Sequence, residues 1–183
     1  MHIPTLIGRA QESVVIKNDM LDRYAHKAIK ITKEIIRINK KEGICHFNFN
    51  DIRYWLENIL SKQRMSMCMR SPCGSGEAMV GFDSSGNIYP CEVLIGFREF
   101  KRKNILNIGS LHEYLGKNKK NQKLRERKVD NIVKCRSCPW KNFCGSGCAA
   151  RAHKDFNNYF REDPQCRYVS KVIEELIWLS NKN

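Results

Sequence analysis

The feature that most limits how this chain can fold is its set of nine cysteines, eight of which lie between residues 68 and 166. A chain of 183 residues can bury an apolar core of its own, so it does not need disulfides to fold. Residues 1–9 lack the basic start and the long apolar run of a secretory signal peptide. We therefore expect a cytoplasmic protein, in which thiols stay reduced and clustered cysteines more often bind metal than form disulfides.

The spacing of these cysteines suits a metal-binding loop. Written with their intervals, the positions are Cys73-x12-Gly86-x4-Cys91-x43-Cys135-x2-Cys138-x5-Cys144-x3-Cys148-x17-Cys166. The two-residue interval between Cys135 and Cys138 lets one turn present two thiolates to the same metal centre. Gly145-Ser146-Gly147 places little side chain between the next two cysteines, which permits tight backbone curvature around a bulky anionic group.

Spacing alone leaves two kinds of metal site open. Thiolates hold iron-sulfur clusters, which the spacing favours, but eight of them could also make two zinc sites. Pro139, Trp140 and Phe143 lie in the same loop. They either exclude water from a cluster, which would affect its reduction potential, or serve as ordinary core residues.

The rest of the sequence predicts an α+β fold, a small cysteine-rich domain with a short β-hairpin, metal-wrapping loops and flanking helices, preceded by a helical bridge. Apolar periodicity and capping residues predict helices over about 21–41, from Asn50 or Asp51 to Leu60, from Ser110 through Leu115 into 117–128, and from Asp163 or Pro164 onward. Strands over 78–82 and 87–91 flank Asp83-Ser84-Ser85-Gly86, which has the residues of a tight turn. Helical periodicity ends near Met65, which predicts a domain boundary there.

The cysteine series resembles the seven-cysteine signature of the SPASM domain, which follows the AdoMet-binding barrel in many radical SAM enzymes. All seven cysteines and the glycine agree with that signature over about residues 66–170. The segments 70–76 (Arg-Ser-Pro-Cys-Gly-Ser-Gly) and 82–91 (Phe-Asp-Ser-Ser-Gly-Asn-Ile-Tyr-Pro-Cys) also look like those of peptide-modifying members of the group. The resemblance implies two auxiliary 4Fe-4S clusters with interleaved ligands.

By that resemblance, the eight cysteines divide into two sets. The first cysteine set would hold one cluster and consists of Cys68, Cys73, Cys91 and Cys148. The second cysteine set would hold the other and consists of Cys135, Cys138, Cys144 and Cys166. Cys68 is the candidate fourth ligand of the first cluster, because some family members place a further cysteine shortly before the signature while others leave one iron open for substrate. Cys45 is expected to pack as a small buried hydrophobe beside Phe47.

The motif that generates the radical is missing from this chain. Radical SAM chemistry needs a cluster held by C-x3-C-x2-C, and Cys144-x3-Cys148 has no cysteine three positions later. We expect residues 1–65 to be the tail of an AdoMet barrel plus a helical bridge, and residues 66–183 to be the SPASM domain with its C-terminal helix. AdoMet would bind only in an N-terminal domain that this chain lacks, so the chain would be inactive alone.

The implied function is electron transfer and substrate anchoring in a peptide or protein maturase. The expected partners are a peptide or protein substrate, an electron donor such as ferredoxin or flavodoxin, and a separate AdoMet-binding subunit. The rival hypothesis is a freestanding zinc-binding interaction module without catalysis.

Nucleic acid and membrane are not expected partners. The formal net charge is +14, but Lys, Ile and Asn are frequent throughout the sequence. Seven basic residues between 117 and 128 are expected to form a solvated helix face: Lys117, Lys119, Lys120, Lys123, Arg125, Arg127 and Lys128. No stretch approaches the roughly 18 apolar residues of a membrane span. His112, His153, Asp83 and Glu92 are not assigned catalytic roles.

Overall fold

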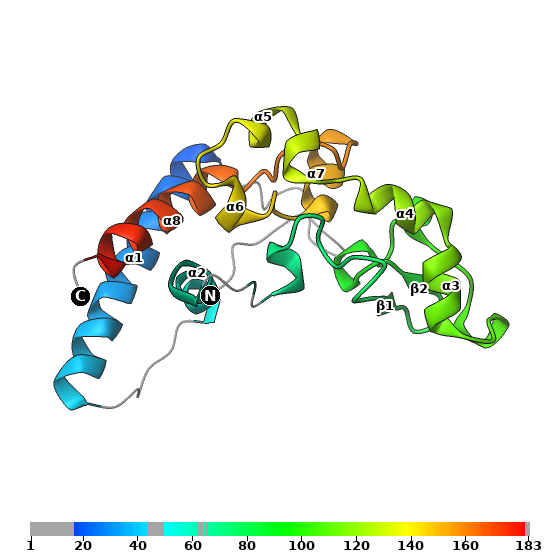
Figure 1. Ribbon diagram of the computed structural model, residues 1–183, viewed down its shortest axis with the longest axis horizontal. Helices are drawn as coiled ribbons and strands as arrows, with labels where there is room; N and C mark the ends of the chain where they lie inside the picture. The colour runs from blue at the N-terminus through cyan, green and yellow to red at the C-terminus, as the bar shows by residue number, and fades with distance from the viewer. Residues whose placement is uncertain (1–16, 44–49, 62–63, 65, 182–183) are drawn as a thin grey trace.

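Long helices occupy one end of the molecule and the β-hairpin lies toward the other, with short helices between them (Figure 1). The computed structural model describes residues 17–43, 50–61, 64 and 66–181. The α-helices in these ranges are α1 (Asn18–Glu42), α2 (Asn50–Ser61), α3 (Leu111–Lys117), α4 (Lys119–Arg125), α5 (Val133–Arg136), α6 (Lys141–Cys144), α7 (Ala149–Phe156) and α8 (Cys166–Ser180). The strands are β1 (Gly81–Phe82) and β2 (Ile88–Tyr89), and the 3-10 helices are η1 (Met67–Met69), η2 (Glu92–Leu94), η3 (Arg98–Phe100), η4 (Ile105–Asn107) and η5 (Val129–Asn131). The predicted α+β class is confirmed.

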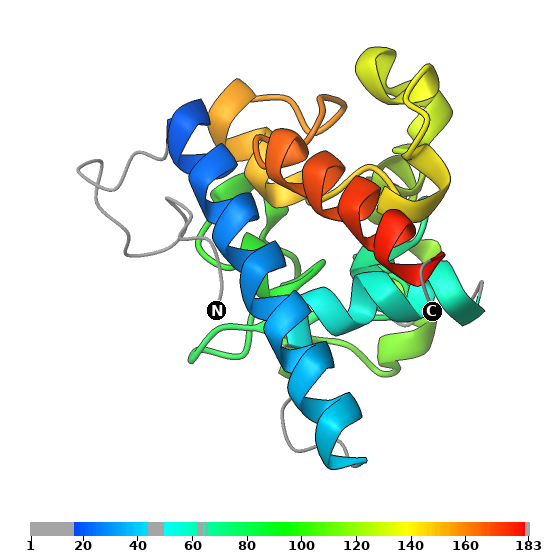
Figure 2. The same cartoon turned by 90° about the vertical axis from the view of Figure 1, so that its left-hand side faces the viewer.

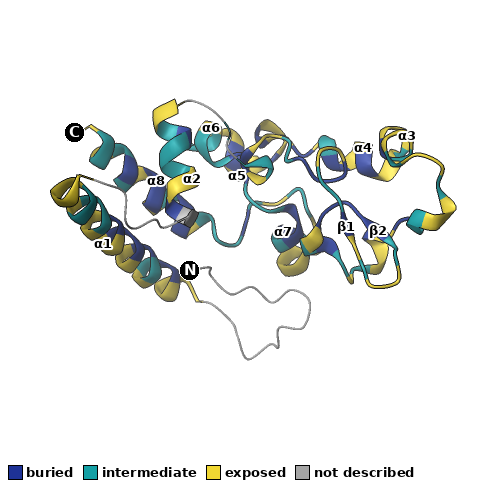
Figure 3. Ribbon diagram, turned by 90° about the horizontal axis from the view of Figure 1, so that it is seen from below, coloured by how far each residue is buried: buried dark blue, intermediate teal, exposed yellow. Residues whose placement is uncertain are grey.

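Helix α1 forms because its apolar residues recur at helical spacing along one side. Leu21, Ala25, Ala28, Ile29 and Thr32 are buried. The side of α1 that faces α8 is buried and its opposite side is exposed (Figure 3). The helix ends where the backbone turns left-handed after Glu42, as the sequence predicts.

Helices α1 and α8 lie side by side, and α2 packs against α8 from a different direction (Figure 2). The core that they share contains Leu21, Ala25, Ala28, Ile52, Tyr168, Val169, Val172, Ile173 and Leu176. Asp22 of α1 pairs with Arg167 and Lys171 of α8, at 2.7 and 2.8 Å. The hydrogen bond from Arg167 is the main reason that the pKa of Asp22 lies well below its usual value.

The boundary predicted near residue 65 stays a prediction. Helix α2 ends at Ser61, and the cysteine-bearing part of the chain begins at η1. Helix α8, however, comes from the last part of the chain and shares its core with α1 and α2. The helical end of the molecule is therefore built from both sides of that boundary.

The hairpin forms at the predicted turn, although its strands are shorter than expected. Gly81 lies opposite Tyr89 in an antiparallel pair. The Asp83 carboxylate accepts hydrogen bonds from the backbone N–H groups of Ser85 and Asn87, at 3.0 and 2.9 Å. Pairing stops after Tyr89 because the chain turns back at the next residues: a Cβ on Gly81 would lie only 2.8 Å from the backbone of Glu92.

The helix predicted from Ser110 through the basic residues is wrong in its extent. Ser110 does cap α3, but the helix breaks at Asn118, whose side chain accepts a hydrogen bond from the N–H of Asn121 and so caps α4. Helix α4 ends at Arg125, so the last residues of the basic stretch lie outside any helix. The prediction failed because Asn competes well for a cap position but poorly for a helix interior.

The last helix begins slightly later than predicted. Helix α8 starts at Cys166, while Asp163 precedes it and accepts a hydrogen bond from the N–H of Gln165 at 2.9 Å. Cys166 therefore lies in the first turn, as the sequence predicts. Within the described residues, no helix is both long enough and apolar enough to cross a membrane.

Ile173 tests how far the molecule depends on this shared core. It belongs to α8, and its side chain is 0% exposed in the core that α8 shares with α1 and α2. Ile173→Ala should lower the free energy of unfolding by about 2 to 5 kcal/mol, because it leaves a cavity that the three helices cannot close. The measurement is urea-induced unfolding followed by circular dichroism. Leu106→Ala, at a side chain that is 88% exposed, should change it by less than about 0.5 kcal/mol. Equal effects of the two substitutions would contradict the assignment of the core.

Candidate metal centre

The second cysteine set lines a single pocket. This pocket has a volume of about 250 Å³, and all four members of the set, Cys135, Cys138, Cys144 and Cys166, contribute to its wall. The other lining residues include Trp140, Val169, Ser146 and Asp163. A zinc ion held by four thiolates at about 2.3 Å fills the space between them. The pocket thus has room for a group larger than one ion.

Short helices and turns bring these four cysteines together. Cys135 lies in α5, and the following turn is closed by a hydrogen bond from the N–H of Cys138 to the carbonyl of Cys135, at 3.0 Å. Cys144 is the last residue of α6, and Cys166 is the first residue of α8. Because α8 is anchored in the helical core, the core determines where the fourth cysteine lies.

The first cysteine set gathers around Cys148. Cys68 lies in η1, Cys91 immediately precedes η2, and Cys148 immediately precedes α7. Desolvation is the main cause that raises the pKa of Cys73 and of Cys68, although Cys68 is an exposed residue, and Cys148 adds to each shift. Burial also raises the pKa of Cys91 to about 12, again with a contribution from Cys148. Cys148 packs against the apolar cluster that contains Cys91.

Burial and neighbouring cysteines also raise the pKa values of thiols in the second set. Burial raises the pKa of Cys135 to about 11 and that of Cys144 to about 12, and Cys166 contributes to both shifts. Burial likewise raises the pKa of Cys166, with a contribution from Cys138. A bound cation would reverse this tendency, because coordination stabilises the thiolate. These sulfurs are thus suited to bind metal and poorly suited to act as free nucleophiles.

The four cysteines of the second set line a pocket instead of converging on a point. Among the residues that the structure describes, no three Cys, His, Asp or Glu side chains are close enough to hold one metal ion. Thiolates that bind the corner irons of a larger cluster need not converge in that way.

The segment Gly145-Ser146-Gly147 connects the two sets through a run of left-handed backbone. The φ angles are 67°, 79° and 67°. A Cβ on Gly145 would overlap the backbone oxygen of Met69, and one on Gly147 would lie 2.5 Å from the Asp163 carboxylate. Glycine is required at both positions because of this φ and this close approach. The sequence-based expectation of tight curvature is confirmed.

Asp163 was predicted only as a helix start, and the structure gives it a larger part. Its carboxylate is 3% exposed and accepts hydrogen bonds from the N–H of Cys148 at 2.7 Å and from Nε of Arg151 at 2.9 Å. It also binds the N–H of Gln165, next to Cys166. One buried carboxylate thus holds the backbone beside a member of each set. No spacing rule in the sequence could reveal these long-range contacts.

For the aromatic residues of the cysteine loop, the structure supports the role of core residues, and the exclusion of water from a cluster stays a prediction. Trp140 and Phe143 pack against the helical core, and Trp140 also lines the pocket of the second set. His153 is structural, as expected: its ring lies against Phe97, Phe100 and Tyr159. Glu92 and His112 are exposed, Asp83 forms the hairpin turn, and Cys45 lies outside the described residues.

Comparisons with known proteins found relatives of similar sequence and solved structures of similar fold. No protein-family model matches the chain. An uncharacterized protein of Archaeoglobus fulgidus is 32% identical over 114 residues, which are 62% of this chain and 26% of that protein. A cysteine-type anaerobic sulfatase-maturating enzyme of Clostridium novyi is 28% identical over 136 residues, which are 70% of this chain and 34% of that enzyme.

Solved structures share the fold. Native anSMEcpe with bound AdoMet, an anaerobic sulfatase-maturating radical SAM enzyme, is similar with a TM-score of 0.72 at 17% identity, over 98% of this chain and 47% of that one. Native anSMEcpe with bound AdoMet and Kp18Cys peptide is similar with a TM-score of 0.70, over 98% of this chain and 48% of that one. The chain therefore spans about half of anSMEcpe, and 26% and 34% of the two curated relatives.

Gly145 tests the left-handed segment. Gly145→Ala should lower the free energy of unfolding by about 1 to 3 kcal/mol from the unfavourable φ angle alone. The new Cβ also meets backbone atoms, which should add to this loss. The measurement is denaturant-induced unfolding. Gly116→Ala is the matched control, since nothing lies within 4 Å of its Cβ and it sits inside α3. This control should be neutral or stabilising by roughly 0.5 to 1 kcal/mol. A neutral Gly145→Ala would show that the segment adopts another backbone conformation.

Proposed function

We propose that this chain binds two 4Fe-4S clusters and serves as the auxiliary-cluster, SPASM part of a radical SAM enzyme that modifies a peptide or protein. The observation that carries the proposal is the pocket of about 250 Å³ whose wall contains all four cysteines of the second set. The sequence similarity to a sulfatase-maturating enzyme of Clostridium novyi supports the enzyme class.

The proposed ligands follow from the two groups. The first cysteine set would hold one cluster, with Cys68 as the fourth ligand, and the second set would hold the other. Seven thiols that are buried or partly buried, a pocket wider than one ion and a glycine-rich segment that lets the backbone approach all suit a bulky anionic cluster. Cys68 is the exposed member of the first set. When bound, such clusters accept and donate single electrons. The residues of this chain hold them, exclude water through Trp140, and keep the two groups at a constant separation.

The partners are part of the same proposal. A structure of anSMEcpe contains a peptide, which supports a peptide or protein as the molecule modified. AdoMet would bind outside this chain, in another part of the enzyme or in a separate subunit. An electron donor such as ferredoxin or flavodoxin would reduce the clusters, and the reaction would take place in the cytoplasm, where thiols stay reduced.

Metal and sulfide analysis separates the proposal from the zinc-binding alternative. Protein purified and reconstituted without oxygen should contain about eight iron and eight sulfide per chain. Stoichiometric zinc without sulfide would instead support a freestanding interaction module.

Single-cysteine variants test the ligand sets. Cys138→Ala should remove the second cluster and lower the iron content by about four per chain, while the first cluster remains. The matched control is Cys45→Ala, which should keep the full iron content, because Cys45 belongs to neither set. Iron and sulfide assays with electron paramagnetic resonance (EPR) distinguish these results. Equal losses in both variants would contradict the assignment.

Cys68 has a test of its own because it stands outside the seven-cysteine signature. If it is the fourth ligand, Cys68→Ala should remove between about one and four iron per chain, all from the first cluster. The EPR signal of the second cluster should be unchanged. Full iron content with unaltered spectra of both clusters would mean that Cys68 is not a ligand.

A further inference from the structure

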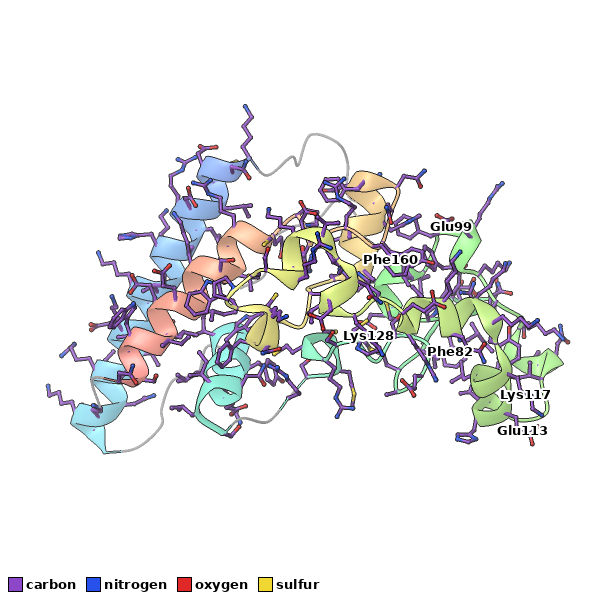
Figure 4. All side chains as sticks on the ribbon, turned by 45° about the horizontal axis from the view of Figure 1, so that its top comes forward. Phe82, Glu99, Glu113, Lys117, Lys128 and Phe160 are labelled. Carbon is purple, nitrogen blue, oxygen red and sulfur yellow. The ribbon has the colours of Figure 1, made fainter. Side chains whose placement is uncertain are left out.

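Arg127 is a buried cation at the centre of the cysteine-bearing region. It belongs to the basic stretch that the sequence analysis assigned to a solvated helix face, but its side chain is only 1% exposed. That assignment is therefore wrong for Arg127. Its neighbour Lys128 is exposed near the middle of the molecule, and Lys117 lies at the far end beside Glu113 (Figure 4). Burying a charge is costly unless something compensates it.

The hydrogen bonds of Arg127 all go to uncharged oxygens. Nη1 donates to the Ser146 hydroxyl at 2.6 Å and to the Gly147 carbonyl at 3.0 Å. Nη2 donates to the Ser146 carbonyl at 3.0 Å and to the Arg161 carbonyl at 3.1 Å. Nε donates to the Tyr159 carbonyl. The guanidinium is thus hydrogen-bonded to the segment between the two cysteine sets. These acceptors are neutral, so they do not compensate its positive charge.

No carboxylate in the described ranges forms an ion pair with Arg127. The nearby Asp163 is paired with Arg151 instead. Burial lowers the pKa of the Arg127 guanidinium, and nearby groups that oppose this change are Cys73, Asp163, Cys148 and Cys135. Cys73 and Cys148 belong to the first cysteine set, and Cys135 belongs to the second. Arg127 also binds Ser146 and Gly147, which lie between Cys144 of the second set and Cys148 of the first, and Ser146 lines the pocket of the second set. The cation therefore lies beside both sets.

We propose that Arg127 is a positioning residue shared by the two clusters, whose positive charge compensates the negative clusters and raises their reduction potentials. The inference rests on the proposed function, since it needs both clusters. A 4Fe-4S cluster with four thiolates becomes more negative when it gains an electron. A fixed cation in a desolvated site therefore favours the reduced form, and one that lies near both sets acts on both.

A second buried arginine provides a matched control. Arg102 is 8% exposed and donates from Nε to Oδ1 of Asn121 at 3.1 Å. Its nearby titratable groups are Tyr114 and Tyr159, not cysteines. Loss of Arg102 removes a buried cation and its hydrogen bonds without removing charge beside the clusters.

The test compares Arg127→Met, Arg127→Lys and Arg102→Met in the reconstituted protein. Iron and sulfide are counted first, and the reduction potentials are then measured by titration with dithionite, followed by EPR. At a fixed ambient potential, Arg127→Met should lower the ratio of reduced to oxidised cluster about tenfold or more, which equals about 59 mV for a one-electron couple. Both clusters should shift in the same direction. Arg127→Lys keeps the charge and should shift much less, and Arg102→Met should leave both potentials unchanged.

The outcomes distinguish the inference about Arg127 from the proposed function. Unchanged potentials in a fully loaded Arg127→Met protein would overturn the inference and leave the proposed function standing. If Arg127→Met loses its clusters while Arg127→Lys keeps them, the charge is needed to hold them and the inference is supported. If Arg127→Lys loses the clusters as well, the hydrogen bonds of the guanidinium are needed to retain them and the positive charge alone is not sufficient. This result would overturn the inference. Absence of iron and sulfide from the unmodified protein would overturn the proposed function itself.

Discussion

The left-handed segment Gly145-Ser146-Gly147 is the constraint on which the cysteine-bearing region depends. It joins Cys144 of the second set to Cys148 of the first within three residues, so the two groups cannot move independently. Its two glycines lack a Cβ, which permits the left-handed conformation and lets Met69 and Asp163 pack directly against the segment. Arg127 binds the carbonyls that such a tight turn would otherwise leave unsatisfied. Curvature, close packing and hydrogen bonding thus support one another at this point.

Helix α8 connects the helical core to the candidate metal centre. Its apolar side packs on α1 and α2, and its first residue is Cys166. Just before it, Asp163 binds the backbone beside Cys148 and the side chain of Arg151. The position of Cys166, a proposed metal ligand, is therefore set by a large apolar core, which is more rigid than a surface loop. This arrangement suits a group that must keep a constant distance from its redox partners.

Much of the fold could be predicted because it depends on local patterns. The spacing of Leu21, Ala25 and Ala28 predicted α1, and the turn at Asp83 predicted the hairpin, since both signals act over a few residues. The long helix after Ser110 was predicted wrongly because the capping preference of Asn118 outweighed continuous helical periodicity. The strands were predicted too long, because their ends depend on where the chain folds back against Gly81, which no local pattern encodes.

The candidate site divides in the same way. By itself, the sequence predicted that eight cysteines form a metal-binding region, because their intervals and the intervening glycines are properties of the chain alone. Only the tertiary structure decided that Arg127 is buried between the two sets and that Asp163 connects them. The contacts that decide this, of Arg127 with Ser146 and of Asp163 with Arg151, join residues 19 and 12 positions apart along the chain. In a linear sequence a buried arginine looks like its solvated neighbours, because burial depends on what the rest of the chain places around it.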